Sequence, residues 1–180
     1  DPVNAYVYRA LAWYLMSMGR LDEAEQAIAK AIEIEPAAIY NHYMQAMAKV
    51  MRKDPAGAQK AADAEPPGPW QDFALALAAQ IGPDRAAAEA TLQATIDNYA
   101  SGYAMQIAEV HAVRGDPDAM FDWLQRAWKA RDPGMQTLLY DALLLRYRDD
   151  PRYAEVAKQA GLPWPPVSAK PSAPVAPVKP

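Results

Sequence analysis

Five Asp-Pro dipeptides divide the sequence into short segments, and this punctuation limits the possible fold more than any other feature. They stand at Asp1-Pro2, Asp54-Pro55, Asp116-Pro117, Asp132-Pro133 and Asp150-Pro151. An aspartate side chain accepts hydrogen bonds from the free N–H groups of a helix's first turn, and proline is pre-set for the first helical position. Each Asp-Pro therefore predicts the start of a helix.

Between these starts apolar residues recur at helical spacing, and strand patterns are nearly absent. Further breaks come from Pro36, Pro66-Pro67 and Pro83. The pattern predicts an all-α chain with helices at residues 3–18, 21–34, 37–52, 55–65, 69–81, 84–98, 102–114, 117–130, 134–146 and 151–160. Residues 163–180 are rich in Pro, Ala and Val and have no helical pattern, which predicts a flexible tail.

Residues 5–38 follow a repeat pattern of about 34 residues that pairs two helices around small side chains. The positions that carry it are Tyr8, Leu11, Ala12, Leu15, Gly19, Ala24, Ile28, Ala31 and Pro36. This stretch resembles the tetratricopeptide repeat family. The resemblance implies an α-solenoid, a right-handed superhelix of helix-turn-helix units. The units would be residues 5–38, 39–68, 69–100 and 101–132, followed by capping helices at about 134–160, all within residues 1–162.

Alanines at the expected helix crossings support this interpretation, because only small side chains let two helices approach closely. Ala12 and Ala24 would face each other in the first unit. In the second unit Pro66 shortens the second helix, and we expect a bend there. The corresponding positions of the later units are Ala46 and Ala58, Ala76 and Ala88, and Ala108 and Met120, with His111 in the slot of the fourth unit that usually holds an aromatic residue.

The last segment resembles a more specific group within this family. It is similar to the closing part of tetratricopeptide regions in large bacterial signalling proteins with cyclase, kinase or winged-helix domains. The residues that carry this likeness are Ile107–Val110, Arg114–Asp116, Trp123–Ala127, Arg148–Tyr153 and Gly161–Pro163. Ala142 and Arg146 depart from it, since the family often has proline there. We therefore expect the helix before the cap to run on further.

Composition and motifs exclude several classes of function. The net charge of −4 does not favour nucleic-acid binding, and no apolar run could span a bilayer. The chain has no cysteine, and its histidines are His42 and His111, so we expect no metal site and no cofactor. No nucleophile–base pair or phosphate-binding glycine loop is present, and Asp149 and Asp150 are best explained by helix capping. We therefore predict that the chain is not an enzyme.

The first helix of each unit would line the concave side of such a superhelix. Helical spacing then predicts a partner-binding groove rich in aromatic residues and methionine, formed by Tyr6, Arg9, Trp13, Tyr40, Tyr43, Met44, Met47, Met51, Trp70, Phe73, Leu77, Gln80, Met105, Gln106 and Glu109. Such a groove suits an apolar peptide or an amphipathic helix. The same stripe also fits internal burial, with residues 134–160 or the tail covering it.

Two functions remain open at this point. One is a protein-interaction scaffold, and the other is a small-molecule sensor that controls an attached output domain. The opening Asp1-Pro2 suggests a piece of a longer bacterial regulatory or assembly protein. The expected C-terminal cap favours a monomer. The composition fits a cytoplasmic or a periplasmic protein, with the cytoplasm favoured.

Overall fold

The computed structural model describes residues 4–164. Its α-helices are α1 (Ala5–Ser17), α2 (Leu21–Ile34), α3 (Asn41–Met51), α4 (Pro55–Ala64), α5 (Pro69–Ile81), α6 (Arg85–Tyr99), α7 (Ala104–Arg114), α8 (Pro117–Ala130) and α9 (Pro151–Gln159). Two 3-10 helices, η1 (Pro133–Tyr140) and η2 (Leu145–Tyr147), lie between α8 and α9. Residues 4–164 contain no strand, so the all-α prediction is confirmed for this part of the chain.

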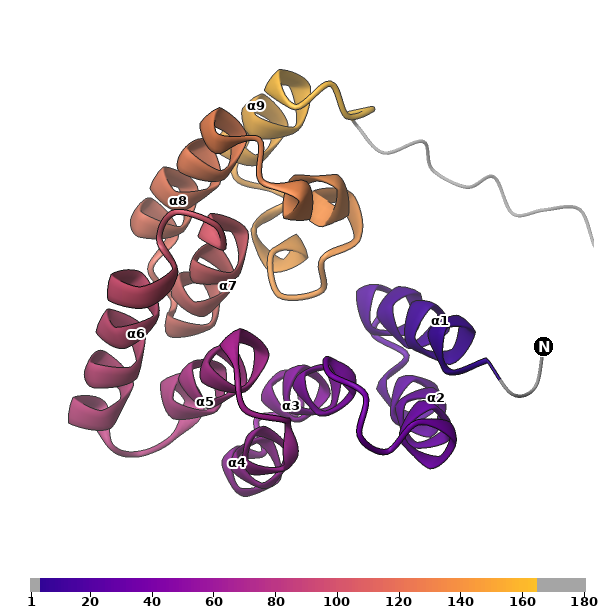
Figure 1. Cartoon of the computed structure of the whole chain (residues 1–180). Helices are drawn as coiled ribbons and strands as arrows, with labels where there is room; N and C mark the ends of the chain where they lie inside the picture. The colour runs from indigo at the N-terminus through magenta and orange to yellow at the C-terminus, as the bar shows by residue number, and fades with distance from the viewer. Residues whose placement is uncertain (1–3, 165–180) are drawn as a thin grey trace, which may run out of the picture.

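The helices form pairs that follow one another along a curved row (Figure 1). Each odd-numbered helix from α1 to α7 packs against the even-numbered helix that follows it. The helices α1, α3, α5 and α7 also contact one another in order, and they lie on the inner side of the curve. This inner side is called the concave side below.

Aspartate caps stand at several of the helix starts, as the sequence predicts. Asp54, Asp116, Asp132 and Asp150 each accept a backbone N–H of the first turn, and a proline follows each of them at the start of the helix. Asp84 caps α6 through its side chain as well, although no proline follows it. The Asp1-Pro2 pair lies outside the described residues, as does most of the tail predicted at 163–180.

Alanines occupy the most crowded positions of the row. Ala12, Ala24, Ala46, Ala58 and Ala76 have no exposed surface, as expected where helices cross closely. They belong to one continuous core that runs through the helix pairs. The predicted alanine crossings therefore lie in the interior.

The helix predicted at residues 37–52 begins only at Asn41. Tyr40 has a left-handed backbone, with φ of 82°, which a regular helix does not contain. The buried carboxylate of Glu65, just after α4, accepts the N–H groups of Tyr40 and Tyr43. Glu65 thus caps α3 from the end of its partner helix and holds Tyr40 in this strained conformation.

The helix predicted at residues 134–146 is replaced by η1, a turn and η2, so the expectation of a longer helix before the cap is wrong. Asp141 explains the break, because its Oδ1 accepts the N–H groups of Leu143 (2.9 Å) and Leu144 (3.1 Å). These bonds offer the backbone an alternative to a continuous helix. We call residues 133–147 the inner segment.

The inner segment lies inside the curve of the row and contacts α1 and α7 (Figure 1). The Tyr140 ring packs on Tyr14 of α1, with 5.3 Å between centroids, and the Tyr147 hydroxyl donates to the carbonyl oxygen of Ala112 in α7 at 2.9 Å. Gly134 allows a close approach, since a Cβ atom there would stand 2.9 Å from the Cβ atom of Met105. The chain therefore covers much of its own concave side.

The end of the row is closed by α9, which packs on α8. Tyr153 is fully buried, and its hydroxyl donates to the carbonyl oxygen of Leu138 in the inner segment. Arg152 lies over the Phe121 ring of α8 and donates to Asp118 at 2.7 Å. The start of α9 thus joins α8 and the inner segment.

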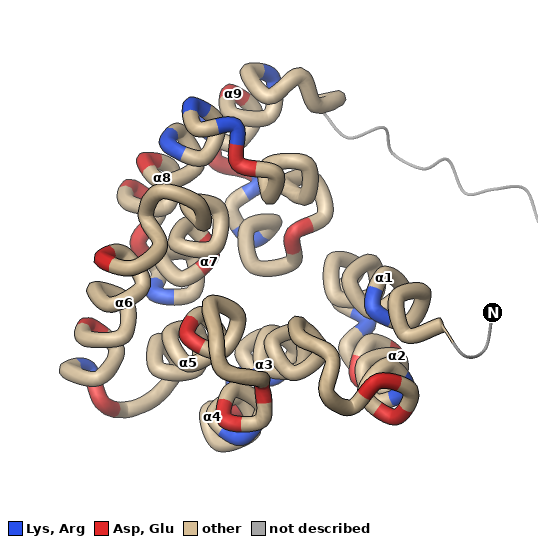
Figure 2. The backbone as a smooth tube through the Cα atoms, viewed as in Figure 1, with Lys and Arg blue, Asp and Glu red and all other residues tan. Residues whose placement is uncertain are grey.

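Charged residues are frequent on α2 and α8, whereas α3 and α5 carry few (Figure 2). Acidic and basic residues are interspersed along the row, without a large region of one sign in this view. Among residues 4–164, no helix is both long enough and apolar enough to cross a membrane.

Candidate functional site

Most of the residues predicted to line an open groove lie in the interior. Trp13, Tyr43, Met44, Met47, Phe73, Leu77, Gln80, Met105 and Glu109 are buried; Arg9, Tyr40, Met51, Trp70 and Gln106 are partly buried; Tyr6 is exposed. The prediction of an open groove is therefore wrong for its central part. The reason is physical, since the inner segment carries apolar side chains that pack onto the same stripe that a partner was expected to cover.

A smaller cleft remains at the N-terminal ends of α3, α5 and α7, with a volume of about 300 Å³. One wall consists of Trp13, Tyr40, Trp70, Tyr103, Gln106 and Glu109, and the opposite wall is the start of the inner segment, Pro133, Gly134, Gln136 and Thr137, with Asp132 before it. We call this space the aromatic cleft. It is the part of the predicted groove that the inner segment leaves open.

Three of the aromatic residues that line the cleft lie at the starts of successive inner helices, α3, α5 and α7. Tyr40 and Tyr103 are the N-cap residues of α3 and α7, and Trp70 is the second residue of α5. The ring centroids of Tyr40 and Trp70 lie 4.6 Å apart at 82°, and those of Trp70 and Tyr103 lie 5.9 Å apart at 84°. Each ring therefore stands edge to face with the next, an arrangement that aromatic pairs favour.

Acidic side chains from the ends of the helix pairs fix two of these helix starts. Neither α3 nor α7 has a side-chain cap of its own. Glu65 caps α3 after the end of α4, and Asp132, after the end of α8, accepts the N–H of Met105 in α7 at 3.1 Å. Because negative charge is favoured at a helix N-terminus, both carboxylates stabilise the end that carries the cleft.

A buried carboxyl pair lies beside the cleft, and one of its members, Glu109, lines it. Glu109 of α7 and Asp141 of the inner segment are almost fully buried. The Tyr43 hydroxyl donates to Glu109, and Asp141 Oδ2 has no hydrogen-bond partner among the described residues. Two buried like charges close together would repel, so one of the two carboxyls is favoured in its protonated form. The pair lies between α7 and the inner segment.

Burial is the main cause that raises the pKa of Glu109 well above its usual range, and the charge of Asp141 adds to it. Burial also raises the pKa of Asp141, although its bonds from Glu109, Leu144 and Leu143 act in the opposite direction. The two backbone N–H donors stabilise the charged form of Asp141. We therefore assign the proton to Glu109 and the negative charge to Asp141.

This pair predicts a loss of stability as the pH rises. The pKa of Glu109 is higher in the folded chain than its ordinary value. Its contribution to the free energy of unfolding is therefore fully present at a pH below the ordinary pKa. This stabilisation is lost as the pH rises through the raised pKa. The urea midpoint of the wild type should fall over this range, and that of Glu109→Gln should fall less steeply. Equal slopes for the two proteins would contradict the raised pKa of Glu109.

A second cavity, of about 410 Å³, continues from the aromatic cleft along α1. The two spaces share Trp13, Tyr40 and Thr137 in their walls. Tyr6, Tyr14 and Ile39 add exposed apolar surface to this second cavity. Arg9 also lines it, with its Nη1 atom 3.4 Å from Asn41 Oδ1 and 3.7 Å from a Glu35 carboxylate oxygen.

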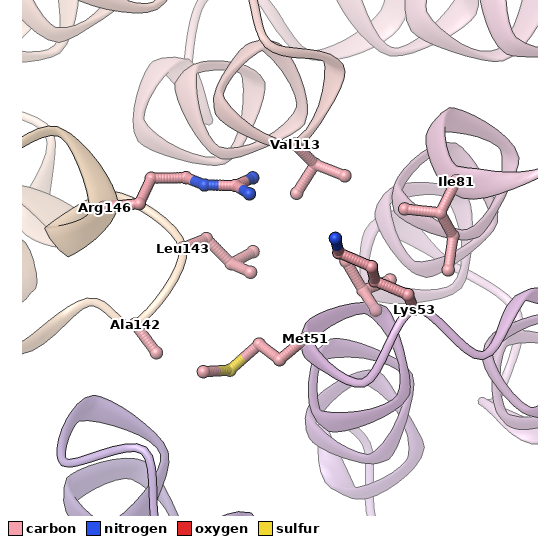
Figure 3. A pocket seen from close by; sticks show the side chains of 8 residues that line it. Met51, Lys53, Ile81, Val113, Ala142, Leu143 and Arg146 are labelled. Atoms are coloured by element: carbon pink, nitrogen blue, oxygen red, sulfur yellow. The ribbon is translucent and has the colours of Figure 1, made fainter.

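A third cavity, of about 450 Å³, lies at the opposite ends of α3, α5 and α7 (Figure 3). Its walls are mainly apolar, with Ile81, Val113 and Leu143 among them, and Lys53 and Arg146 extend into it from two sides. Arg146 donates to the carbonyl oxygen of Ala112 near the end of α7. Cations are favoured at helix C-termini, so helix-end stabilisation accounts for this arrangement.

Groups for metal binding or acid–base chemistry are sparse in the described part of the chain. Residues 4–164 contain no group of three or more His, Cys, Asp or Glu that could hold a metal ion. Neither ring nitrogen of the buried His111 has a hydrogen-bond partner among these residues, and burial lowers the pKa of His111. Its Nδ1 atom lies 3.7 Å from Asp116 Oδ2, and the ring is packed in the interior.

No protein-family model, curated protein or solved structure matches the chain. The geometry of its own residues is therefore the basis of the functional assignment that follows.

Proposed function

We propose that the chain is a binding module of the tetratricopeptide type, an α-solenoid that holds a segment of a partner protein. The binding surface runs from the exposed side of α1 into the aromatic cleft. The repeat pattern of residues 5–38, the ordered contacts between the inner helices and the paired packing of neighbouring helices support this assignment. Binding rather than catalysis is the proposed activity.

The distribution of exposed apolar side chains carries the proposal. In the described residues the large apolar side chains that remain exposed are Tyr6, Val7, Leu11, Tyr14, Met18, Ile39 and Trp128. All except Trp128 belong to α1, its C-cap or the residue that precedes Tyr40. Tyr6, Tyr14 and Ile39 line the cavity beside the aromatic cleft, whereas Leu11 and Met18 line a separate cavity between α1 and α2. The first group carries the proposal, because clustered apolar surface is typical of interaction sites, whereas single exposed apolar residues need no explanation.

A short peptide fits this surface, whereas a long helix would need the predicted groove along the whole concave side. The inner segment blocks the centre of the concave side, so a partner would enter at the end formed by α1, α3 and α5. The two neighbouring cavities there share Trp13 and Tyr40 as aromatic lining, and polar groups also line both of them. Aromatic side chains of this kind supply most of the affinity in many interfaces. We propose that the module belongs to a larger bacterial regulatory protein.

The size and the aromatic lining of the cleft also favour a second candidate, a small-molecule sensor. Ligand pockets span roughly 300–1,000 Å³ and are lined mainly by apolar and aromatic side chains. The cleft has about 300 Å³, and its aromatic walls are Trp13, Tyr40, Trp70 and Tyr103. A sensor would pass the effect of its ligand to an attached domain through the inner segment.

Peptides selected from a random displayed library against the wild type test the main proposal. We expect them to be rich in apolar residues and to bind the double variant Tyr6→Lys/Ile39→Lys at least about ten-fold more weakly, because hot-spot contacts account for most binding energy. Stability should change little, since Tyr6 is 68% and Ile39 is 61% exposed. Fluorescence anisotropy of labelled peptides measures the affinities.

Trp128→Lys is the matched control, because Trp128 is the exposed apolar residue on α8, far along the chain from α1. It should leave peptide binding unchanged. If both variants bind the selected peptides like the wild type, the α1 surface is not the docking site and the proposal is wrong.

A further inference from the structure

We propose that the aromatic cleft binds an organic ammonium ion, with Trp13, Tyr40, Trp70 and Tyr103 around the alkylated nitrogen and Glu109 as its counter-ion. The natural ligand would be a methylated amine, carried by a peptide side chain or by a small molecule. This inference deepens the proposed function and rests on it, because the cleft is the inner end of the proposed binding surface. Free ammonium ions nevertheless test it without any peptide.

The aromatic walls of the cleft suit a cation. Ring faces carry negative potential and attract cations that lie within about 6 Å of the ring centroid, and tryptophan does so most strongly. Trp13, Tyr40, Trp70 and Tyr103 line one space of about 300 Å³. The steep angles along Tyr40, Trp70 and Tyr103 make these rings walls of a corner rather than a flat stack. Such a corner accommodates a rounded alkylated cation.

The acidic groups around the cleft also favour a positive ligand. Asp132 lines the cleft as a carboxylate, and Glu109 lines it as a protonated carboxyl that a bound cation would ionise. Asp132 uses its two oxygens for the N–H groups of Met105 and Gly134, so its charge is fixed in place. Among the described residues, neither Lys nor Arg lines this cleft, and Arg9 lines the neighbouring cavity instead.

Choline, a small ion with one trimethylammonium group, is the probe of choice for this cleft.

Glu109 makes binding sensitive to pH. Burial and the charge of Asp141 hold the pKa of Glu109 high, and a bound cation lowers it by favouring the carboxylate. Binding should therefore release a proton and strengthen as the pH rises. The titratable groups near Glu109 are Tyr40 and Tyr43 at α3, and Asp132 and Asp141. From α5 the uncharged Trp70 lines the same cleft. Arg9 of α1 acts on Tyr40.

Calorimetric titration of the full chain with choline tests the inference. The control ligand is the uncharged carbon analogue, in which a tert-butyl group replaces the trimethylammonium group. We expect choline to bind at least about ten-fold more tightly than this analogue. Titrations in two buffers with different ionisation enthalpies should show proton release on choline binding alone.

A short apolar peptide with one trimethyllysine distinguishes the two sources of the ammonium group. If the natural ligand is a peptide side chain, this peptide should bind more tightly than choline, and Tyr6→Lys/Ile39→Lys should remove the difference. If the natural ligand is a small molecule, the peptide should bind no better than choline. The same peptide with unmodified lysine is the control, and it should bind more weakly in either case.

Two variants separate the roles of the walls and of the acid. Trp70→Leu keeps the wall apolar and should weaken choline binding about ten-fold while changing the analogue little. Glu109→Gln keeps the shape and the hydrogen-bonding capacity of the side chain, and it should abolish both the proton release and the increase in affinity with pH. If Trp70→Leu unfolds the chain, Glu109→Gln still decides the question.

Equal affinities for choline and the uncharged analogue would overturn the inference, and so would unchanged proton release in Glu109→Gln. If the chain binds the selected peptides but not choline, the proposed ammonium site is wrong and the proposed function stands. Choline binding together with unchanged peptide binding to Tyr6→Lys/Ile39→Lys would contradict the proposed function alone. The two proposals can therefore fail separately.

Discussion

Replacing Met47 with aspartate is expected to unfold the chain or to lower its free energy of unfolding by about 4 kcal/mol or more. Met47 lies in the middle of α3 and has no exposed surface. Aspartate at this position would place a charge among apolar side chains without a partner, and it would also remove the packing of the methionine. Urea unfolding followed by circular dichroism measures the change.

Met18→Asp is the matched control. Met18 is the C-cap residue of α1 and is 59% exposed, so the same substitution there should change stability by less than about 1 kcal/mol. A stable, fully helical Met47→Asp variant that has lost peptide binding would contradict this expectation. It would mean that the concave side is open and that Met47 belongs to a binding groove.

Asp141→Ala is expected to have the second largest effect, a loss of about 3 kcal/mol or more. The substitution leaves the buried N–H groups of Leu143 and Leu144 without an acceptor. It also removes the group that faces the protonated carboxyl of Glu109. Since these contacts hold the turn of the inner segment, we expect the segment to separate from α7 before the helix pairs unfold.

Asp141→Asn distinguishes this mechanism from a general loss of packing. The asparagine oxygen can still accept the N–H groups of Leu143 and Leu144, while its amide can donate to an ionised Glu109. This variant should be much more stable than Asp141→Ala and should lose part of the pH dependence. Equal destabilisation of the two variants would show that the carboxylate itself, rather than the hydrogen bonds at the turn, is required.

The helical part of the fold can be predicted from the sequence because its signals are local. The capping oxygen of Asp116 and the ring of Pro117 act within one turn of the chain, and the structure places the start of α8 where they predict it. Tyr40 shows the limit of such signals. Its left-handed backbone is held by Glu65, a residue 25 positions away, and this contact delays the start of α3.

Whether the predicted groove is open or covered depends on long-range contacts, and helical periodicity does not predict them. A stripe of large apolar residues at helical spacing looks the same whether a partner or the chain itself covers it. Tyr43 is buried, and its hydroxyl bonds to Glu109, which lies 66 positions further along the chain. The inner segment in turn depends on the side-chain bonds of Asp141, and helical periodicity does not reveal them.

Tyr103 is absent from the predicted groove, although it lies in the helix predicted at 102–114 and three positions before Gln106. In the structure it is the N-cap of α7, a position that corresponds to Tyr40 at the start of α3. A comparison of the residues at the start of each first helix brings Tyr40, Trp70 and Tyr103 together. The polar side of the cleft, Gln136 and Thr137, has no signal of this kind, since it comes from a segment predicted to be a regular helix.

Hydrogen exchange at the amides of Leu143 and Leu144 tests most directly whether the inner segment fills the concave side. Both N–H groups are bonded to a buried carboxylate inside the curve of the row. We expect them to exchange within about ten-fold of the slowest amides of α3 and α7. Exchange as fast as in an unstructured chain would contradict the covered concave side, because that side would then be open most of the time.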